Sequence, residues 1–328
     1  MKKWLINKIL LLSTISLPIL AVSSCYQKAD EEIKLKPKKQ VTNNEMKINQ
    51  IASKLITNNQ ERDLYISQQK NIPDDIITEL KASMIYANIS NVKVLEKSSS
   101  VLNNQVKNAI IAITNTLTKD WYWYLNNLNK NKYVLNPFNE NYSDITNLEE
   151  TKNNPKNTKS IFQYVLNKNK TYAIDMKNAN IQDIISYEIP NEKFDIYQNK
   201  KINFILFDNN TFILYFTYSK DNKNNILIIP DVFLIINNQE AKEITSKFKD
   251  SFITALNQRI QNKTNYDILT GSNQQEALDN AYKAFSDKKL FTMYEPNNYS
   301  GIFYDATMLL NNNEMQLLRY TWGEINED

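Results

Sequence analysis

The chain of 328 residues contains no histidine, one cysteine and only three glycines. Without histidine it cannot form a Ser-His-Asp or Cys-His catalytic group, or a zinc site with imidazole ligands. One cysteine excludes an intrachain disulfide framework, a cysteine-type zinc finger and an iron–sulfur cluster. Gly271, Gly301 and Gly323 stand far apart, which excludes a glycine-rich phosphate loop. We therefore expect no metal, no cofactor and a protein that is not an enzyme.

Apolar residues are abundant enough for a packed core. They make up 42% of the chain, and charged residues make up 23%. These proportions are typical of a globular protein and exclude a wholly disordered chain. The frequent use of asparagine, lysine, isoleucine and tyrosine is typical of an AT-rich genome.

Residues 1–24 have the three-part layout of a secretory signal peptide. Lys2, Lys3 and Lys8 form a basic start, and an apolar stretch follows over residues 9–22. That stretch is shorter than the roughly 20 apolar residues that a transmembrane helix needs. The sequence therefore predicts export and removal of residues 1–24.

The only cysteine lies where this segment becomes polar. The string Val22-Ser23-Ser24-Cys25 resembles the lipobox of bacterial lipoproteins. The resemblance implies cleavage before Cys25 and a diacylglycerol on its thiol, so the membrane is the expected partner and the extracellular face the expected location. Two acyl chains anchor stably, since each buried CH₂ contributes about 0.8 kcal/mol. The alternatives are a plain signal peptide with an incidental cysteine and an uncleaved N-terminal anchor.

The balance of charge gives no reason to expect nucleic acid as a partner. The 39 basic residues exceed the 36 acidic ones by three, and Lys2, Lys3 and Lys8 account for that excess. The chain that remains after cleavage is therefore formally neutral. It lacks the net basic field that attracts phosphates.

The first part of the mature chain is predicted to be a tether followed by helices. Residues 25–44 are polar, which predicts a flexible tether. Residues 45–136 indicate a helical subdomain that begins with an apolar face of Ile48, Ile51, Ala52 and Leu55. A further stripe predicts one helix of six turns, and it consists of Val106, Ile110, Ile113, Leu117, Trp121, Tyr124 and Leu128. Residues 137–158 are expected to form a loop.

Residues 159–328 are predicted to form a sheet followed by helices. Apolar runs at 202–207 and 212–218 flank Asp208-Asn209-Asn210, which predicts a hairpin because Asn and Asp tolerate left-handed backbone. With further runs at 226–229 and 232–236, we expect an antiparallel sheet of four to six strands. The near-continuous apolar runs indicate that helices cover at least one of its faces.

Helical patterns return after residue 241, and the chain ends in a mixed segment. Ser272 with Gln275 resembles a capping box. Residues 299–322 are expected to form a hairpin over Asn311-Asn312-Asn313. The expected fold class is thus α+β, with an N-terminal helical region, a central antiparallel sheet and C-terminal helices.

The most unusual local feature is the string Trp121-Tyr122-Trp123-Tyr124. Successive residues of a helix point about 100° apart, so four in a row cannot all face one core. Trp121 and Tyr124 belong to the apolar stripe, and Tyr122 and Trp123 are expected to point sideways or outward. The string is therefore either an aromatic platform that stacks on a ligand or a packing cluster enclosed by other elements.

At this point the sequence resembles a known group of proteins. A lipobox, an Asn-, Lys- and Ile-rich composition and a WYWYL-type string (Trp121 to Leu125) resemble surface lipoproteins of mollicutes, above all the mycoplasma aromatic-motif membrane proteins. The resemblance implies a lipid-anchored protein on the outside of a wall-less cell. It supplies no catalytic residues.

Three functions are compatible with these observations. The first is a non-enzymatic surface lipoprotein that contacts host or environmental molecules. The second is a lipoprotein that captures a substrate for a transporter, with Trp121 or Trp123 in the wall of a cleft. The third is a hydrolase with two facing carboxyl groups, for which Asp74/Asp75, Glu149/Glu150 and Asp305 are the available acids.

Overall fold

The computed structural model separates Met1–Gln40 from a second compact unit, Val41–Asp328. All residues that the structure describes belong to the second unit: 42–87, 108–109, 112–113, 115–135, 173–190, 198–236, 239–286, 302–311 and 316–325. The predicted signal peptide, Cys25, all but the last residues of the tether, and the predicted loop at 137–158 lie outside them. No helix among the described residues is both long and apolar enough to cross a membrane.

The N-terminal helices follow the predicted pattern. They are α1 (Asn43–Leu55), α2 (Asn59–Gln68) and α3 (Asp74–Ala87). The Thr42 hydroxyl caps α1 by accepting a hydrogen bond from the Glu45 N–H at 3.2 Å. Ile48, Ile51 and Ala52 are buried, as the apolar face predicts. Since α1 begins at Asn43, the last two residues assigned to the tether are helical.

The predicted six-turn helix is wrong as a continuous element. Asp120 has φ −110° and ψ 31°, which interrupts the helix, and α6 (Trp121–Asn126) begins after it. A short 3₁₀ turn, η1 (Leu128–Lys130), follows α6. The stripe itself is confirmed where it is described, because its members there are all buried: Ile113, Leu117, Trp121, Tyr124 and Leu128.

One sheet of seven antiparallel strands organises the unit, in the order β2-β1-β7-β6-β5-β4-β3. The strands are β1 (Asn131–Leu135), β2 (Ala173–Asp175), β3 (Ile181–Glu188), β4 (Gln198–Phe207), β5 (Thr211–Lys220), β6 (Lys223–Ile235) and β7 (Leu317–Ile325). The predicted antiparallel sheet is confirmed, but the predicted count of four to six strands is too low. β1 lies inside the range expected to be helical. β7 pairs with β1 and β6 instead of forming the predicted terminal hairpin.

The turns of the central hairpins depend on left-handed asparagine and aspartate. Asn210, with φ 59°, closes the predicted hairpin between β4 and β5. Asp221 and Asn222, with φ 53° and 60°, form the two-residue turn between β5 and β6. This conformation matches the twist of antiparallel strands. β6 continues through Pro230, beside which its register with β5 shifts and its pairing with β7 ends.

Helices cover both faces of the sheet. Along β5, Phe212, Leu214 and Phe216 join one core cluster, while Ile213 and Tyr215 join the other. One cluster, the tyrosine–tryptophan face, packs against α1, α3 and α6; its buried Tyr and Trp residues are Trp121, Tyr122, Trp123, Tyr124, Tyr133, Tyr215, Tyr320 and Trp322. The opposite cluster, the phenylalanine face, contains Phe204, Phe212, Phe216, Phe233, Phe248 and Phe252.

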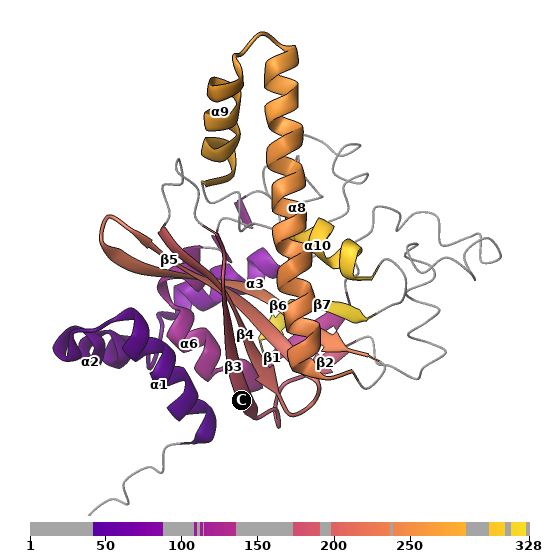
Figure 1. Cartoon of the computed structure of the whole chain (residues 1–328). Helices are drawn as coiled ribbons and strands as arrows, with labels where there is room; N and C mark the ends of the chain where they lie inside the picture. Colours follow the sequence, from indigo (N-terminus) through magenta and orange to yellow (C-terminus); the bar gives the residue numbers. More distant parts are fainter. Residues whose placement is uncertain are drawn as a thin grey trace, which may run out of the picture. The chain divides into compact units, whose positions relative to one another are not determined.

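The C-terminal helices belong to the phenylalanine face. They are α8 (Ala241–Leu269), α9 (Gln274–Ser286) and α10 (Ile302–Leu310). The first half of α8 packs on the sheet through Ile244, Phe248 and Phe252. With 29 residues, α8 is about 43 Å long. Figure 1 shows that its second half continues beyond the strands with α9 alongside.

Candidate functional site

The aromatic string of α6 is enclosed by the protein's own residues. The exposed fractions of Trp121, Tyr122, Trp123 and Tyr124 are 4, 5, 6 and 0%. A ring that stacks on a ligand must offer a free face, and none of these four does. Tyr122 and Trp123, expected to point sideways or outward, are buried because helices from elsewhere in the chain cover α6.

The N-terminal helices provide part of this cover. The Tyr65 ring of α2 stacks on Trp121 with ring centroids 5.8 Å apart, and it meets Tyr122 edge-on at 6.5 Å. The Tyr122 hydroxyl donates a hydrogen bond of 2.7 Å to the Asn49 side chain of α1. Aromatic pairs of this kind contribute about 0.5–1.5 kcal/mol beyond their buried area. The string therefore joins α1 and α2 to α6.

The other side of the string contacts the sheet. The Tyr124 ring lies edge-on to Trp322 of β7 at 4.9 Å, and its hydroxyl is 2.8 Å from that of Tyr133 on β1. Complete burial raises the pKa of Tyr133 far above the usual tyrosine value. The Tyr133 hydroxyl thus remains neutral at physiological pH, and the two hydroxyls form one buried hydrogen bond.

A buried amide holds the break that precedes the string. The Gln69 side chain donates to the Asp120 carboxylate at 2.7 Å and accepts from the Trp123 N–H at 3.2 Å. Gln69 and Asp120 are 5% and 4% exposed. The first turn of a helix has free N–H groups, and Gln69 satisfies one of them. This pair fixes where α6 begins and hence which way its rings point.

The arrangement favours packing over ligand binding for the string. A substrate-capturing role would need Trp121 or Trp123 in the wall of a cleft, and both side chains instead pack within the tyrosine–tryptophan face. The rings connect α1 and α2 to β1 and β7 through ring contacts and directed hydrogen bonds. Through these contacts, the string fixes those elements relative to one another.

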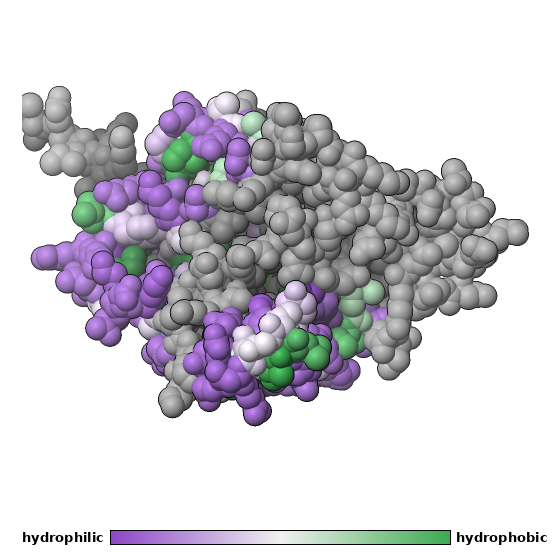
Figure 2. All heavy atoms as spheres, turned by 90° about the horizontal axis from the view of Figure 1, so that it is seen from above, coloured by the Kyte–Doolittle hydropathy of each residue, from purple (hydrophilic) through white to green (hydrophobic). Residues whose placement is uncertain are grey.

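Among the residues that the structure describes, three exposed large apolar side chains lie near one another in sequence at the end of α8. Leu269 is 86% exposed, Tyr266 63% and Ile268 41%. The turn between α8 and α9 faces the viewer in Figure 2, where hydrophobic patches are bordered by hydrophilic surface. The sequence patterns did not predict this group of exposed apolar side chains. The pair Ile268-Leu269 comes directly before Thr270-Gly271, and glycine is common just after the end of a helix. Apolar side chains in the last turn of a helix have no following turn to pack against, so this pair could have indicated an exposed apolar group.

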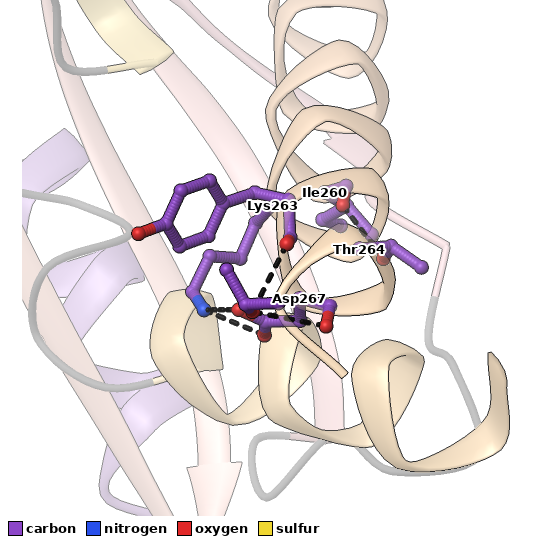
Figure 3. Close-up of polar contacts among 6 residues, drawn as sticks. Ile260, Lys263, Thr264 and Asp267 are labelled. Atoms are coloured by element: carbon purple, nitrogen blue, oxygen red, sulfur yellow. Dashed lines mark hydrogen bonds and ion pairs between the residues drawn. The ribbon is translucent and has the colours of Figure 1, made fainter. Parts of the chain in front are cut away.

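Local contacts hold this end of α8 in one conformation. The Gly271 N–H donates to the Ile268 carbonyl, and the Ser272 N–H donates to the Asp267 carbonyl, which together form a Schellman motif with Gly271 at φ 111°. The Lys263 ammonium binds both oxygens of Asp267 and lies 5.8 Å from the centroid of the Tyr266 ring (Figure 3). The only charges of residues 260–275 are therefore paired with each other.

The turn into α9 corrects the predicted capping box by one residue. The cap is Asn273, whose side chain accepts from the Glu276 N–H at 3.0 Å. Its amide also donates to the Glu276 carboxylate at 3.3 Å. Asn273 therefore has the cap role that was assigned to Ser272, and Glu276 bonds the Asn273 side-chain amide instead of completing a capping box through the backbone N–H.

The described acids that were considered for hydrolysis belong to helices on opposite faces of the sheet, α3 and α10. Asp74 and Asp75 are exposed in the first turn of α3, and Glu149 and Glu150 lie outside the described residues. Asp305 of α10 binds Arg259 of α8, and burial raises the pKa of its carboxyl group. Within the described part of the chain, no group of three His, Cys, Asp or Glu could hold a metal ion.

Comparisons with known proteins give one match. A family model described as an aromatic cluster surface protein matches residues 24–274, which is more than half of the chain. No curated protein and no solved structure matches the chain.

Proposed function

Because the chain belongs to the aromatic cluster surface protein family, we propose that it is a lipid-anchored, non-enzymatic contact protein on the surface of a wall-less bacterium. The observation that supports this most is where the family match begins. It starts at residue 24, next to Cys25, and so leaves out nearly all of the segment that cleavage before Cys25 would remove. A surface protein processed at this position retains one thiol at its first residue, where a diacylglycerol can be attached.

The anchor is tested by metabolic labelling with a fatty-acid analogue. Wild-type protein should take up the label and partition into detergent, whereas Cys25→Ser should do neither. The matched control is Ser24→Ala, which leaves the thiol in place and should be labelled like wild type. Equal labelling of wild type and Cys25→Ser would refute lipidation.

We further propose that the end of α8 is the surface that meets the partner. Leu269, Tyr266 and Ile268 are presented by a helix whose other half is buried in the phenylalanine face. Fully burying one such side chain contributes about 1.5–3 kcal/mol. Because the local charges are paired, a partner with a neutral, partly apolar surface fits best, and its binding should depend little on salt.

Binding of the fluorescently labelled mature chain to host cells tests this contact. Leu269→Glu should weaken binding by tenfold or more, since it places a charge at the centre of the exposed apolar group. Leu64→Glu is the matched control, because Leu64 is also exposed, at 60%, but lies on α2. Equal loss in both variants, or in neither, would show that α8 does not make the contact.

A further inference from the structure

The first helix of the folded unit is fastened to the edge of the sheet by side-chain hydrogen bonds. Asn44 of α1 accepts from the Ile181 N–H at 2.7 Å and donates to the Ala179 carbonyl at 3.0 Å. Asn43 donates to the Ile181 carbonyl at 3.3 Å, and Lys47 donates to the Gln182 carbonyl at 3.3 Å. Four bonds thus join the first turns of α1 to residues more than 130 positions away.

These hydrogen bonds lie at an edge of the sheet. Among the described strands, β3 is the last on its side of the sheet, so none of them pairs with its outer N–H and C=O groups. The Asn44 amide bonds to this edge as a backbone peptide of one more strand would. An edge covered in this way is also protected from pairing with other chains.

The same helix is held a second time by the aromatic string. Ile48, Ile51 and Ala52 of α1 are buried in the tyrosine–tryptophan face. Asn49 accepts the hydrogen bond of Tyr122, which is next to Trp123 and Tyr124 in α6. Tyr124 in turn contacts Tyr133 and Trp322 of the sheet. The chain that enters the folded unit is therefore connected to the sheet by two separate routes.

We propose that α1, its bonds to β3 and the aromatic string form a mechanical anchorage that passes tension from the tether into the sheet. This inference rests on the proposed function, since tension arises only if Cys25 is tied to a membrane while the folded unit holds a partner. Asn43 and Asn44 are the first two residues of α1, so tension from the tether reaches their bonds to the sheet before it reaches the rest of the helix. The aromatic string is the second attachment, which holds α1 if the edge bonds open.

Single-molecule pulling along two axes tests the anchorage. In the first, the mature chain carrying Asn257→Cys is pulled between the Cys25 thiol and the new thiol on α8, so that α1 lies in the load path. In the second, Cys25→Ser is combined with Lys223→Cys and Asn257→Cys, and the pull avoids α1. Residues 223 and 257 are both exposed. On each axis, the lifetime at constant force is measured for protein that retains Asn44 and for protein that carries Asn44→Ala.

On the first axis, Asn44→Ala should shorten the lifetime at constant force by about tenfold, because it removes two hydrogen bonds of the anchorage. Asn44→Asp keeps the acceptor for the Ile181 N–H and should lie between the two. On the second axis the lifetime should be unchanged. Equal shortening on both axes would show a purely structural role, and no shortening on the first would show that the bonds bear no load; either result overturns the proposal.

The outcome can be separated from that of the lipid anchor. The pulling experiment uses unlipidated protein, so it can succeed although the labelling of Cys25 fails. In that case the anchorage exists but the membrane does not load it. If labelling succeeds and pulling fails, the protein is membrane-bound and its attachment to the sheet lies elsewhere.

Discussion

The fully buried aromatic residues differ between the two faces of the sheet, although Phe207 belongs to the tyrosine–tryptophan face and the partly buried Tyr187 and Tyr218 pack against the other. On the phenylalanine face, Phe212 stacks on Phe233 at 5.2 Å, and both rings also contact Phe248 of α8. On the tyrosine–tryptophan face, rings of similar size end in hydroxyl groups that reach defined partners, such as Tyr122 with Asn49 and Tyr124 with Tyr133. The one face relies on close packing, and the other adds directed hydrogen bonds to it.

This difference between the two faces corresponds to the lengths of the helices that pack on them. Among the described helices of the phenylalanine face, the long helix α8 packs on the sheet through an apolar stripe that includes Ile244, Phe248 and Phe252, and this close packing is sufficient to place it. The opposite face must hold several short helices from the N-terminal part of the chain. Short helices have few buried contacts each, so hydrogen bonds between named groups are needed to fix their positions.

Removal of a central phenylalanine should have the largest effect on stability. Phe248 is fully buried and contacts Phe204, Phe212 and Phe233. Phe248→Ala should lower the free energy of unfolding by about 3–5 kcal/mol, measured by denaturant titration. Phe248→Leu fills most of the space and should cost about 1.5 kcal/mol or less. Similar losses in both variants would mean that the face does not depend on close packing.

A polar change on the other face should rank second. Gln69→Leu keeps the size of the side chain but removes both bonds to Asp120 and Trp123, and each buried group left unpaired costs about 1–3 kcal/mol. We expect a loss of about 2–4 kcal/mol in the same titration. Gln68→Leu, at the exposed neighbouring position, is the control and should stay within about 0.5 kcal/mol of wild type. If the two variants unfold alike, the tyrosine–tryptophan face is held by packing alone.

Local sequence signals predicted the part of the fold that local chemistry decides. The hairpin at Asn210 follows from turn residues, and the cover of the sheet by helices follows from its apolar runs. The sequence did not predict the strand β1 or its pairing with β7, because that pairing joins residues such as Tyr133 and Trp322 that are far apart in sequence. β1 also directly follows a helical stripe, and no proline or glycine marks the change.

The site was predictable in its residues but not in its environment. The string at residues 121–124 is conspicuous in the sequence, whereas its cover comes from Tyr65, Asn49 and Trp322 in other elements. Asp120 also interrupts the helix directly before the string, with φ −110° and ψ 31°. Periodicity alone could not include this break, since the stripe of buried residues continues across it.

Alkaline pH should weaken the tyrosine–tryptophan face. Burial raises the pKa of Tyr320 from 10 to about 12. A tyrosine whose pKa is higher in the folded state stabilises fully below pH 10, and this stabilisation is lost as the pH rises toward 12. The free energy of unfolding should then fall by up to about 1.4 kcal/mol per pH unit for each such residue. Tyr320→Phe should make that fall less steep, and parallel curves for wild type and variant would contradict the assignment.

The smallest and sharpest test concerns the hydroxyl pair between α6 and β1. Tyr124→Phe leaves the ring against Trp322 but takes one partner from the Tyr133 hydroxyl, so we expect a loss of about 1–2 kcal/mol. Tyr133→Phe should cost a similar amount. The double variant removes both hydroxyls from the buried site and should cost less than the sum of the two, with a coupling of about 0.5 kcal/mol or more. Additive losses would mean that the hydroxyls act independently, and the two faces would then differ in composition but not in how they hold their helices.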